Sequence, residues 1–294
     1  MNKVWFITGS ARGLGRHLTE AVLELGDQVA ATARNTAALK DLVARYPQQI
    51  LPLFLDVTDN GAILRAVADT VAHFGRIDVL VNNAGFGVTG AAEAFTDEQV
   101  RSQLEANLYA PIQVTRAVLP YMRAQGSGRI LQVSSVGGRV GTAGVSIYQA
   151  AKFGISGFTE ALRQEVEPLG IFVTSIEPGG FRTDWAGSSM DFAPAIADYA
   201  LVNQRAEAFR SGSFEPMGDP AKAAQAMLKA VSHPAPPVHL VLGSEAVALL
   251  EMADDSRKRE LEQWRSVSLS TDHDEATPFL ETPLGKAYAA YQNA

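Results

Sequence analysis

The chain has 294 residues, which is enough for one large domain or two small ones. Apolar residues make up 47% and charged residues 19%, so a sizeable core can form and a globally disordered chain is excluded. The formal charge is −7, from 25 Lys and Arg against 32 Asp and Glu, which argues against nucleic-acid binding through bulk positive charge. There is no cysteine, so disulfides, thiolate zinc sites and a cysteine nucleophile are excluded.

Neither a membrane span nor an export signal is expected. No apolar run approaches the roughly 20 residues that a bilayer requires, and no signal-peptide cleavage pattern precedes the Gly-rich sequence near the N-terminus. We therefore expect a cytoplasmic protein. No metal site is predicted, because the histidines show no ligand spacing; they are His17, His73, His233, His239 and His273.

Short apolar runs alternate with helical patterns along most of the chain. The runs predict strands at Val4–Ile7, Val29–Thr32, Ile50–Leu55, Val79–Val81, Arg129–Val133, Ile171–Ile176 and Val238–Leu242. The helical patterns cover Leu14–Leu25, Ala37–Ala44, Ile63–Phe74, Glu98–Arg123, Ile147–Glu167, Pro220–Val231 and Ala246–Trp264. This order predicts an α/β fold with a doubly wound parallel sheet between two helix layers.

No stretch of the sequence is a convincing linker, so we predict a single domain. Residues 1–242 form the α/β domain, and the Gly-, Pro- and aromatic-rich stretch at about 180–218 is predicted as a helical lid inserted in it. Residues 243–294 are predicted as a C-terminal extension packed on the same domain, with a charged helix followed by an irregular tail.

A glycine-rich segment lies between the first strand and the first helix. It reads Thr8-Gly9-Ser10-Ala11-Arg12-Gly13-Leu14-Gly15. Glycines here allow a tight turn and let backbone N–H groups approach a pyrophosphate at the helix N-terminus. The segment therefore predicts a dinucleotide site; a Gly-rich turn without a ligand is the alternative.

The spacing Gly-x-x-x-Gly-x-Gly resembles the short-chain dehydrogenase/reductase family, whose fold is of the Rossmann type. The resemblance extends from Lys3 to about Leu242, because other family motifs follow in order. They are Asp56-Val57, Asn82-Asn83-Ala84-Gly85, Asn107, Ser135, Tyr148-x-x-x-Lys152 and Pro178-Gly179 followed by Thr183. The resemblance implies that Asp56 meets the adenine ring and that the Pro178 segment closes over the nicotinamide.

The candidate catalytic residues are Asn107, Ser135, Tyr148 and Lys152. On a helix, Tyr148 and Lys152 share a face, and a nearby ammonium should lower the pKa of the phenol. Tyr148 would then exchange a proton with a substrate oxygen while Ser135 stabilises charge on it. The resemblance implies that Lys152 also holds the nicotinamide ribose and that Asn107 positions a water. Ser134 is an alternative to Ser135 for this role, and only the spacing from Tyr148 favours Ser135.

The residues after the second strand predict the cofactor. NAD sites place an acid about 20 residues after the glycine loop, but here Ala33 and Arg34 stand at that place. With Arg12, Arg34 could bind a 2′-phosphate through charge-assisted bonds, so NADP(H) is predicted. The expected cofactor-binding residues are Gly9, Ser10, Arg12, Gly13, Leu14, Gly15, Arg34, Asp56, Val57, Asn83, Ala84, Gly85, Tyr148, Lys152, Pro178, Gly179 and Thr183.

The substrate side is less specific. Its candidate residues are Phe86, Val136, Gln149, Phe181 and Trp185, which neighbour the catalytic motifs in the chain. Aromatic and Met side chains of the predicted lid favour an apolar substrate, although they could equally pack the lid itself; they are Trp185, Met190, Phe192, Tyr199, Phe209 and Phe214.

The sequence thus predicts an NADPH-dependent reductase of small ketones or aldehydes, with Tyr148 as the general acid. A non-catalytic NADP(H)-binding sensor or scaffold, an epimerase or dehydratase, and a reductase of carrier-bound 3-oxoacyl groups remain alternatives. The resemblance implies a homodimer or homotetramer built through Glu98–Arg123 and Ile147–Glu167. The length beyond Leu242 puts the family's commonest tetramer in question. The charged run Glu251–Arg265 is a solvated helix face or an oligomer contact.

Overall fold

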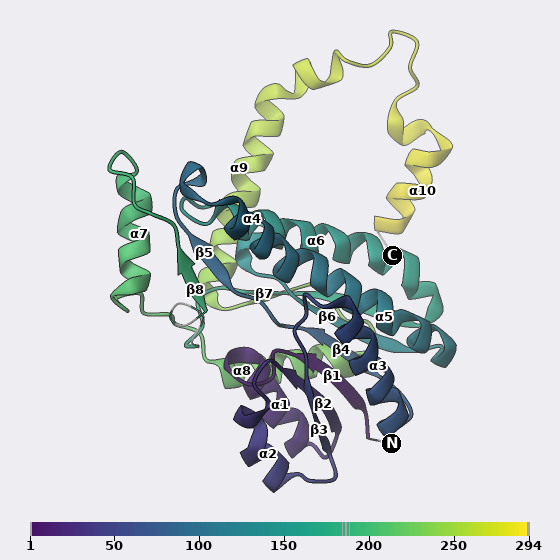
Figure 1. Ribbon diagram of the computed structural model, residues 1–294. Coiled ribbons are helices and arrows are strands. Elements are labelled where there is room, and N and C mark those ends of the chain that lie inside the picture. The colour runs from purple at the N-terminus through teal and green to yellow at the C-terminus, as the bar shows by residue number, and fades with distance from the viewer. Residues whose placement is uncertain (1, 184, 186, 188, 293–294) are drawn as a thin grey trace. The chain divides into compact units, whose positions relative to one another are not determined.

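A seven-stranded parallel sheet forms the centre of the computed structural model, which describes residues 2–183, 185, 187 and 189–292. Its order is β3-β2-β1-β4-β6-β7-β9 (Figure 1). Strands are added on one side of β1 up to β3 and on its other side from β4 onward, so the strand order reverses between β1 and β4. The predicted doubly wound α/β fold is confirmed. The strands are β1 Val4–Thr8, β2 Gln28–Ala33, β3 Ile50–Phe54, β4 Val79–Asn82, β6 Gly128–Val133, β7 Ile171–Pro178 and β9 His239–Leu242.

Both faces of the sheet are buried, which explains why the strands are mostly apolar. In β1, Trp5 and Ile7 belong to one core cluster and Phe6, between them, belongs to the other. Successive side chains of a strand point to opposite faces. The sheet can therefore hold a helix layer on each side.

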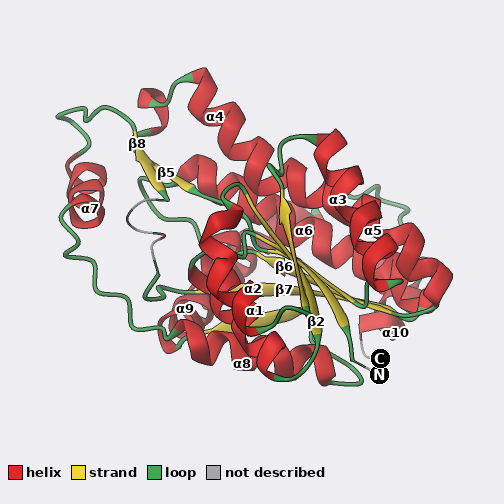
Figure 2. Ribbon diagram, turned by 60° about the horizontal axis from the view of Figure 1, so that its bottom comes forward, coloured by secondary structure: helices red, strands yellow, loops and turns green. Residues whose placement is uncertain are grey.

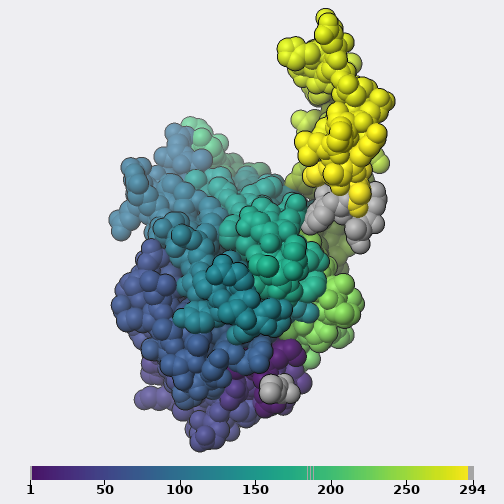
Figure 3. Space-filling model, turned by 90° about the vertical axis from the view of Figure 1, so that its right-hand side faces the viewer, coloured from purple at the N-terminus to yellow at the C-terminus, as the bar shows by residue number. Residues whose placement is uncertain are grey.

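The helices cover the two faces in separate layers. α1 and α8 pack together on one face, and α3, α5 and α6 lie on the other (Figure 2). Figure 3 shows the outer surface of this second layer, coloured from blue to teal. The helices are α1 Gly13–Glu24, α2 Lys40–Arg45, α3 Asn60–Phe74, α4 Asp97–Leu104, α5 Ala110–Gln125, α6 Ser146–Val166, α7 Ala200–Arg210, α8 Pro220–Ser232, α9 Ser244–Leu269 and α10 Pro283–Gln292.

Two predicted helices differ from the structure. The stretch Glu98–Arg123 is interrupted, because Glu105–Tyr109 forms one π-helical turn between α4 and α5. Such turns insert one extra residue per hydrogen-bonded ring and occur often at functional sites. The predicted helix Ala37–Ala44 divides into a 3₁₀ turn, Thr36–Leu39, followed by α2. The prediction of an irregular tail is wrong for α10.

The lid contains structure that the sequence did not predict. Strand β8, Met190–Phe192, pairs in parallel with β5, Gly87–Thr89, which begins one residue beyond the Asn-Asn-Ala-Gly motif. The base of the lid closes where Phe181 bridges Gly218. The predicted lid of residues 180–218 thus begins and ends at one point; its residues 184, 186 and 188 lie outside the described part of the chain.

The chain forms two compact units, Met1–Leu250 and Glu251–Ala294. The second unit contains the C-terminal part of α9, a turn at Phe279–Glu281, and α10. In it the Gly285 backbone N–H donates to Thr282 Oγ1 at 3.0 Å at the start of α10. Across the described residues, no helix is both long and apolar enough to cross a bilayer.

Candidate active site

A cavity of about 570 Å³ opens where β1, β4, β6 and β7 end. The loops after these strands form its walls, together with the first turns of α6 and residues of the lid. In doubly wound sheets, ligands bind at the carboxyl ends of the strands beside the point where the strand order reverses. The position and volume of this cavity are those of a small-molecule site.

All four predicted catalytic residues line this cavity, and Ser135, Tyr148 and Lys152 lie together in it. Tyr148 and Lys152 lie one turn apart on α6, and Ser135 follows β6. The Ser135 hydroxyl hydrogen-bonds to Tyr148, and Lys152 Nζ donates to Val133 O at 2.7 Å, 5.7 Å from the centre of the Tyr148 ring. All three line the cavity. The tertiary structure therefore places two hydroxyl groups together with a buried ammonium beside them.

The expectation that Lys152 lowers the pKa of Tyr148 is wrong for this arrangement. Burial raises the pKa of Tyr148 to about 12, because a phenolate is poorly solvated there; the hydrogen bond from Ser135 only partly opposes this rise. Burial also lowers the pKa of Lys152 to about 8. Tyr148 is thus a protonated phenol at neutral pH.

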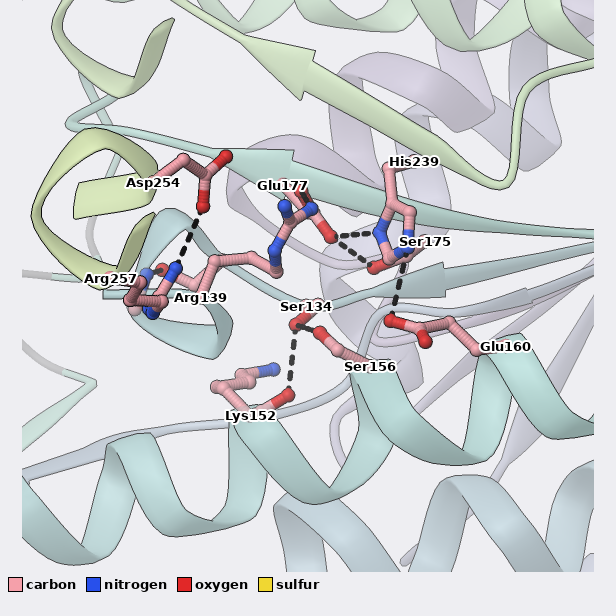
Figure 4. Close-up of polar contacts among 12 residues, drawn as sticks. Ser134, Arg139, Lys152, Ser156, Glu160, Ser175, Glu177, His239, Asp254 and Arg257 are labelled. Atoms are coloured by element: carbon pink, nitrogen blue, oxygen red, sulfur yellow. Dashed lines mark hydrogen bonds and ion pairs between the residues drawn. The ribbon is translucent and has the colours of Figure 1, made fainter. Parts of the chain in front are cut away.

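The hydrogen-bond partners of Ser134 and Ser135 distinguish the two candidate serines. Ser134 Oγ is buried against α6, at 2.9 Å from Ser156 Oγ and 3.2 Å from Lys152 O (Figure 4). Ser135 Oγ accepts from the Gly137 N–H at 3.0 Å and faces Tyr148. Ser134 therefore anchors a helix, and the geometry favours Ser135 as the group that contacts a substrate oxygen.

Asn107 lies within the π-helical turn and is bound to backbone. Its Nδ2 donates to Phe86 O at 2.7 Å, and its Oδ1 accepts from the Phe86 N–H at 3.1 Å. A side-chain amide has two donor hydrogens and two acceptor sites. These bonds fix the segment after Gly85 and leave half of the amide's capacity for the predicted water.

The glycine loop has the shape that a dinucleotide requires. Gly9 and Gly13 have φ angles of +70° and +56°, which side chains rarely adopt. Asn83 Nδ2 donates to Thr8 O and Gly9 O at 2.9 and 3.1 Å, so the loop is tied to the end of β4. Gly9, Arg12, Gly13 and Leu14 of this loop line the cavity, as does Thr183. These residues fit a bound nicotinamide dinucleotide.

Gly15 is predicted to tolerate no side chain. A Cβ there would lie 2.3 Å from Gly9 O and 2.4 Å from Asn83 Nδ2. We expect Gly15→Ala to lower the free energy of unfolding by about 1–3 kcal/mol, because the backbone around it would have to move. Urea unfolding measures this. Gly157→Ala is the control, since it lies exposed on α6 with no neighbour within 4 Å; an equal loss in both variants would contradict the prediction.

Some predicted cofactor residues lie outside the cavity. Arg34 is exposed after β2, and its charge contributes to the lowered pKa of Asp56, which the Thr58 backbone N–H lowers most. Val57 follows Asp56 at the end of β3. Ser10 is fully buried, with its hydroxyl donating to Ile7 O at 2.9 Å, so its side chain supports the loop.

The predicted substrate residues all line the cavity, but one of them, Gln149, already has its amide engaged in hydrogen bonds. Phe86, Val136, Phe181 and Trp185 contribute apolar surface. The Gln149 amide is already bonded to Val140 O at 2.8 Å and to both the Oγ1 and N–H of Thr142. Gln149 therefore holds a loop in place.

The aromatic side chains of the lid divide into two groups. Trp185, Phe209 and Phe214 form a chain of ring contacts that begins at Tyr148, with ring centres 5.2, 6.1 and 5.3 Å apart, and they line the cavity. The others pack the lid: Phe192 lies under the Arg210 guanidinium, the Tyr199 hydroxyl donates to Glu93, and the Met190 sulfur accepts from Thr89.

A buried carboxylate supports the segment that precedes Pro178. Glu177 Oε1 accepts from Ser175 Oγ at 3.0 Å and lies 2.6 Å from His239 Nδ1, while its Oε2 is 3.5 Å from Arg139 Nη1 (Figure 4). His239 thus has a structural partner. Within the described residues, no group of three His, Cys, Asp or Glu side chains could hold a metal ion.

Comparison with known proteins identifies the family. A sequence profile of the short chain dehydrogenases matches residues 3–193. The chain belongs to the short-chain dehydrogenase family. It is 45% identical over 273 residues to the oxidoreductase BOA17 of Botryotinia fuckeliana, covering 92% of this chain and all of that protein. A short-chain dehydrogenase structure from Streptomyces avermitilis is 42% identical, with a TM-score of 0.88 over 93% of this chain and all of that one.

More distant short-chain dehydrogenase structures share the fold. One from Burkholderia phymatum, in complex with NAD, is 19% identical with a TM-score of 0.76, over 88% of this chain and 95% of that one. Another from Burkholderia cenocepacia, in complex with NADP, is 24% identical with a TM-score of 0.72, over 89% and 97%. This short-chain dehydrogenase is therefore an oxidoreductase, and its fold occurs with either nicotinamide cofactor.

Several lining residues of this short-chain dehydrogenase were not predicted from the sequence. Leu201, Gln204, Arg205 and Ala208 reach the cavity from α7, and Glu245 reaches it from the first turn of α9. The spacing of three and four residues on α7 was a usable signal, since it places these residues on one helix face. Glu245 gave no such signal, because only the tertiary structure brings it to Gly180, whose N–H donates to its Oε2 at 3.1 Å.

Proposed function

We propose that this protein is an NADPH-dependent reductase of ketones or aldehydes. The observation that carries the proposal is the meeting of the Ser135 and Tyr148 hydroxyls in a largely apolar cavity, with Lys152 buried beside them. Two neighbouring hydroxyl groups that line one cavity suit a carbonyl oxygen, on which charge develops during reduction.

Each residue has a distinct part in this reaction. The nicotinamide cofactor supplies a hydride to the carbonyl carbon when it is bound. Tyr148, which its raised pKa keeps protonated at neutral pH, donates its proton to the carbonyl oxygen. Ser135 hydrogen-bonds the same oxygen and stabilises the developing charge. Lys152 returns a proton toward Tyr148, which its lowered pKa of about 8 makes easy near neutral pH.

NADPH consumption with a panel of aryl and aliphatic ketones and aldehydes tests this function. We expect the protein to consume NADPH when a carbonyl compound is added and not when buffer is added in its place. Tight NADPH binding without turnover of any carbonyl compound would favour the sensor or scaffold function instead. Turnover only of 3-oxoacyl groups bound to a carrier protein would favour the acyl-carrier alternative.

The cofactor preference has its own test. Arg34 is exposed beside Asp56 at the edge where an adenosine 2′-phosphate would lie. We expect Arg34→Asp to lower the ratio of kcat/KM for NADPH to that for NADH by about tenfold or more, because a carboxylate repels a phosphate. Steady-state kinetics with both cofactors measures the ratio.

Arg45→Asp is the matched control, since Arg45 lies on α2 with its guanidinium 5.1 Å from the centre of the Tyr46 ring. It changes the charge by the same amount and should leave the ratio unaltered. An unchanged ratio in Arg34→Asp would show that Arg34 does not recognise a 2′-phosphate.

A further inference from the structure

One face of the lid helix α7 forms a wall of the cavity. Helix α7 lies beside strand β8 in both ribbon views (Figures 1 and 2). Residues at spacings of three and four along it reach the cavity, and they are Leu201, Gln204, Arg205, Ala208 and Phe209. Four of these five side chains are uncharged, so Arg205 is the cation of this wall.

Arg205 is held near the start of α6. Its Nη1 donates to Ala143 O at 2.8 Å. A Cβ on Gly144 would lie 3.7 Å from Arg205 Cδ, and Gly144 precedes Tyr148 by four residues. The guanidinium therefore lies at the end of α6 that carries Tyr148, and the bond to Ala143 uses only one of its five N–H donors.

No carboxylate of the described chain neutralises Arg205. The residues three and four positions away on α7 are Leu201, Val202, Ala208 and Phe209, none of which is acidic. Among the described residues, no Asp or Glu oxygen forms an ion pair with it. A cation that faces a cavity without a protein anion is available to an anionic ligand.

The other charged groups that line the cavity lie on other elements than α7. Arg12 belongs to the glycine loop, and Lys152 lies behind Tyr148 with its ammonium bonded to Val133 O. Glu245 accepts from the Gly180 N–H. Between Tyr148 and α7 the wall is aromatic, formed by Trp185 and Phe209. An anion at Arg205 is thus separated from the hydroxyl pair by apolar surface.

We propose that the substrate is a keto acid with an apolar or aromatic body, whose carboxylate binds Arg205 while its carbonyl oxygen reaches Ser135 and Tyr148. This inference rests on the proposed reductase function. A charge-assisted, two-pronged bond between guanidinium and carboxylate fixes orientation as well as adding affinity. Arg205 then selects the acid over its neutral ester by about tenfold or more.

Matched pairs of ligands test the proposal. The kcat/KM for NADPH-dependent reduction is measured with para-acetylbenzoate, para-benzoylbenzoate and their methyl esters. Binding of biphenyl carboxylate and its carboxamide to the protein with NADP⁺ is measured by calorimetry. The wild type is expected to prefer the acid in each pair. Arg205→Gln should lose that preference with the ester and amide unchanged, and Arg205→Lys should retain part of it.

Arg210→Gln is the control and should keep the wild-type preference for the acid. Arg210 lies on the same helix, but its guanidinium carbon lies 4.5 Å from the centre of the Phe192 ring. Equal losses for acid and ester in Arg205→Gln would show that Arg205 only holds the lid to Ala143, and they would overturn the proposal. So would a wild type that binds carboxylate no better than carboxamide. Carboxylate binding without any turnover would support the anion site and contradict the reductase function, and turnover without acid preference would do the reverse.

Discussion

Replacing Tyr148 with Phe is expected to lower kcat for carbonyl reduction by about 10²–10⁴-fold, the range for loss of a general acid. The substitution removes one oxygen atom and keeps the ring that packs 5.2 Å from Trp185. Cofactor affinity should therefore change little. The measurement is steady-state NADPH oxidation, with NADPH binding followed separately by calorimetry.

Tyr199→Phe is the matched control for this substitution. Its hydroxyl is bonded to Glu93 at 2.6 Å on the exposed side of the lid, and it does not line the cavity. It should retain the wild-type rate. A fall of less than about tenfold in Tyr148→Phe would show that another group donates the proton.

Replacing Lys152 with Met is expected to abolish most activity and to change how stability depends on pH. Burial lowers the pKa of Lys152 from 10.5 to about 8 in the folded protein. The unfolded chain therefore binds this proton more tightly, and burying the ammonium costs stability below pH 8. That cost disappears as the pH rises from about 8 to about 10.5.

Over this pH range, the free energy of unfolding of the wild type should rise relative to Lys152→Met by a few kcal/mol, at about 1.36 kcal/mol for each pH unit of the shift. Urea unfolding of both proteins at a series of pH values measures the difference. Lys222→Met on the exposed side of α8 is the control and should show no such rise. A flat difference for Lys152→Met would mean that burial does not lower the pKa of Lys152, because its ammonium is stabilised as well in the folded protein as in the unfolded chain.

The order of the sheet and its helices was predictable because it depends on local patterns. Fully apolar runs such as Val79–Val81 are required wherever a strand is buried on both faces. The glycine loop was equally predictable from the sequence, because the positive φ angles at Gly9 and Gly13 favour glycine at these two positions. The pairing of Tyr148 with Lys152 follows from the helical repeat alone.

The tertiary structure alone decided which neighbours these residues have. It buries Ser134 against Ser156 and leaves Ser135 beside Tyr148, a choice that two adjacent serines do not reveal. It also reverses the expected pKa shift of Tyr148, because burial depends on the whole fold and raises the pKa of the phenol.

The lid shows the same limit most clearly. The parallel pairing of β5 with β8 joins segments about a hundred residues apart, and three-residue strands are too short to give a sequence pattern. Arg205 was not singled out from the sequence, because its place in the cavity depends on how α7 packs against Gly144. Local sequence thus determined the scaffold and the residue types of its candidate catalytic groups. Long-range packing decided their solvation and the wall that α7 gives the cavity, because both depend on residues that are distant in the chain.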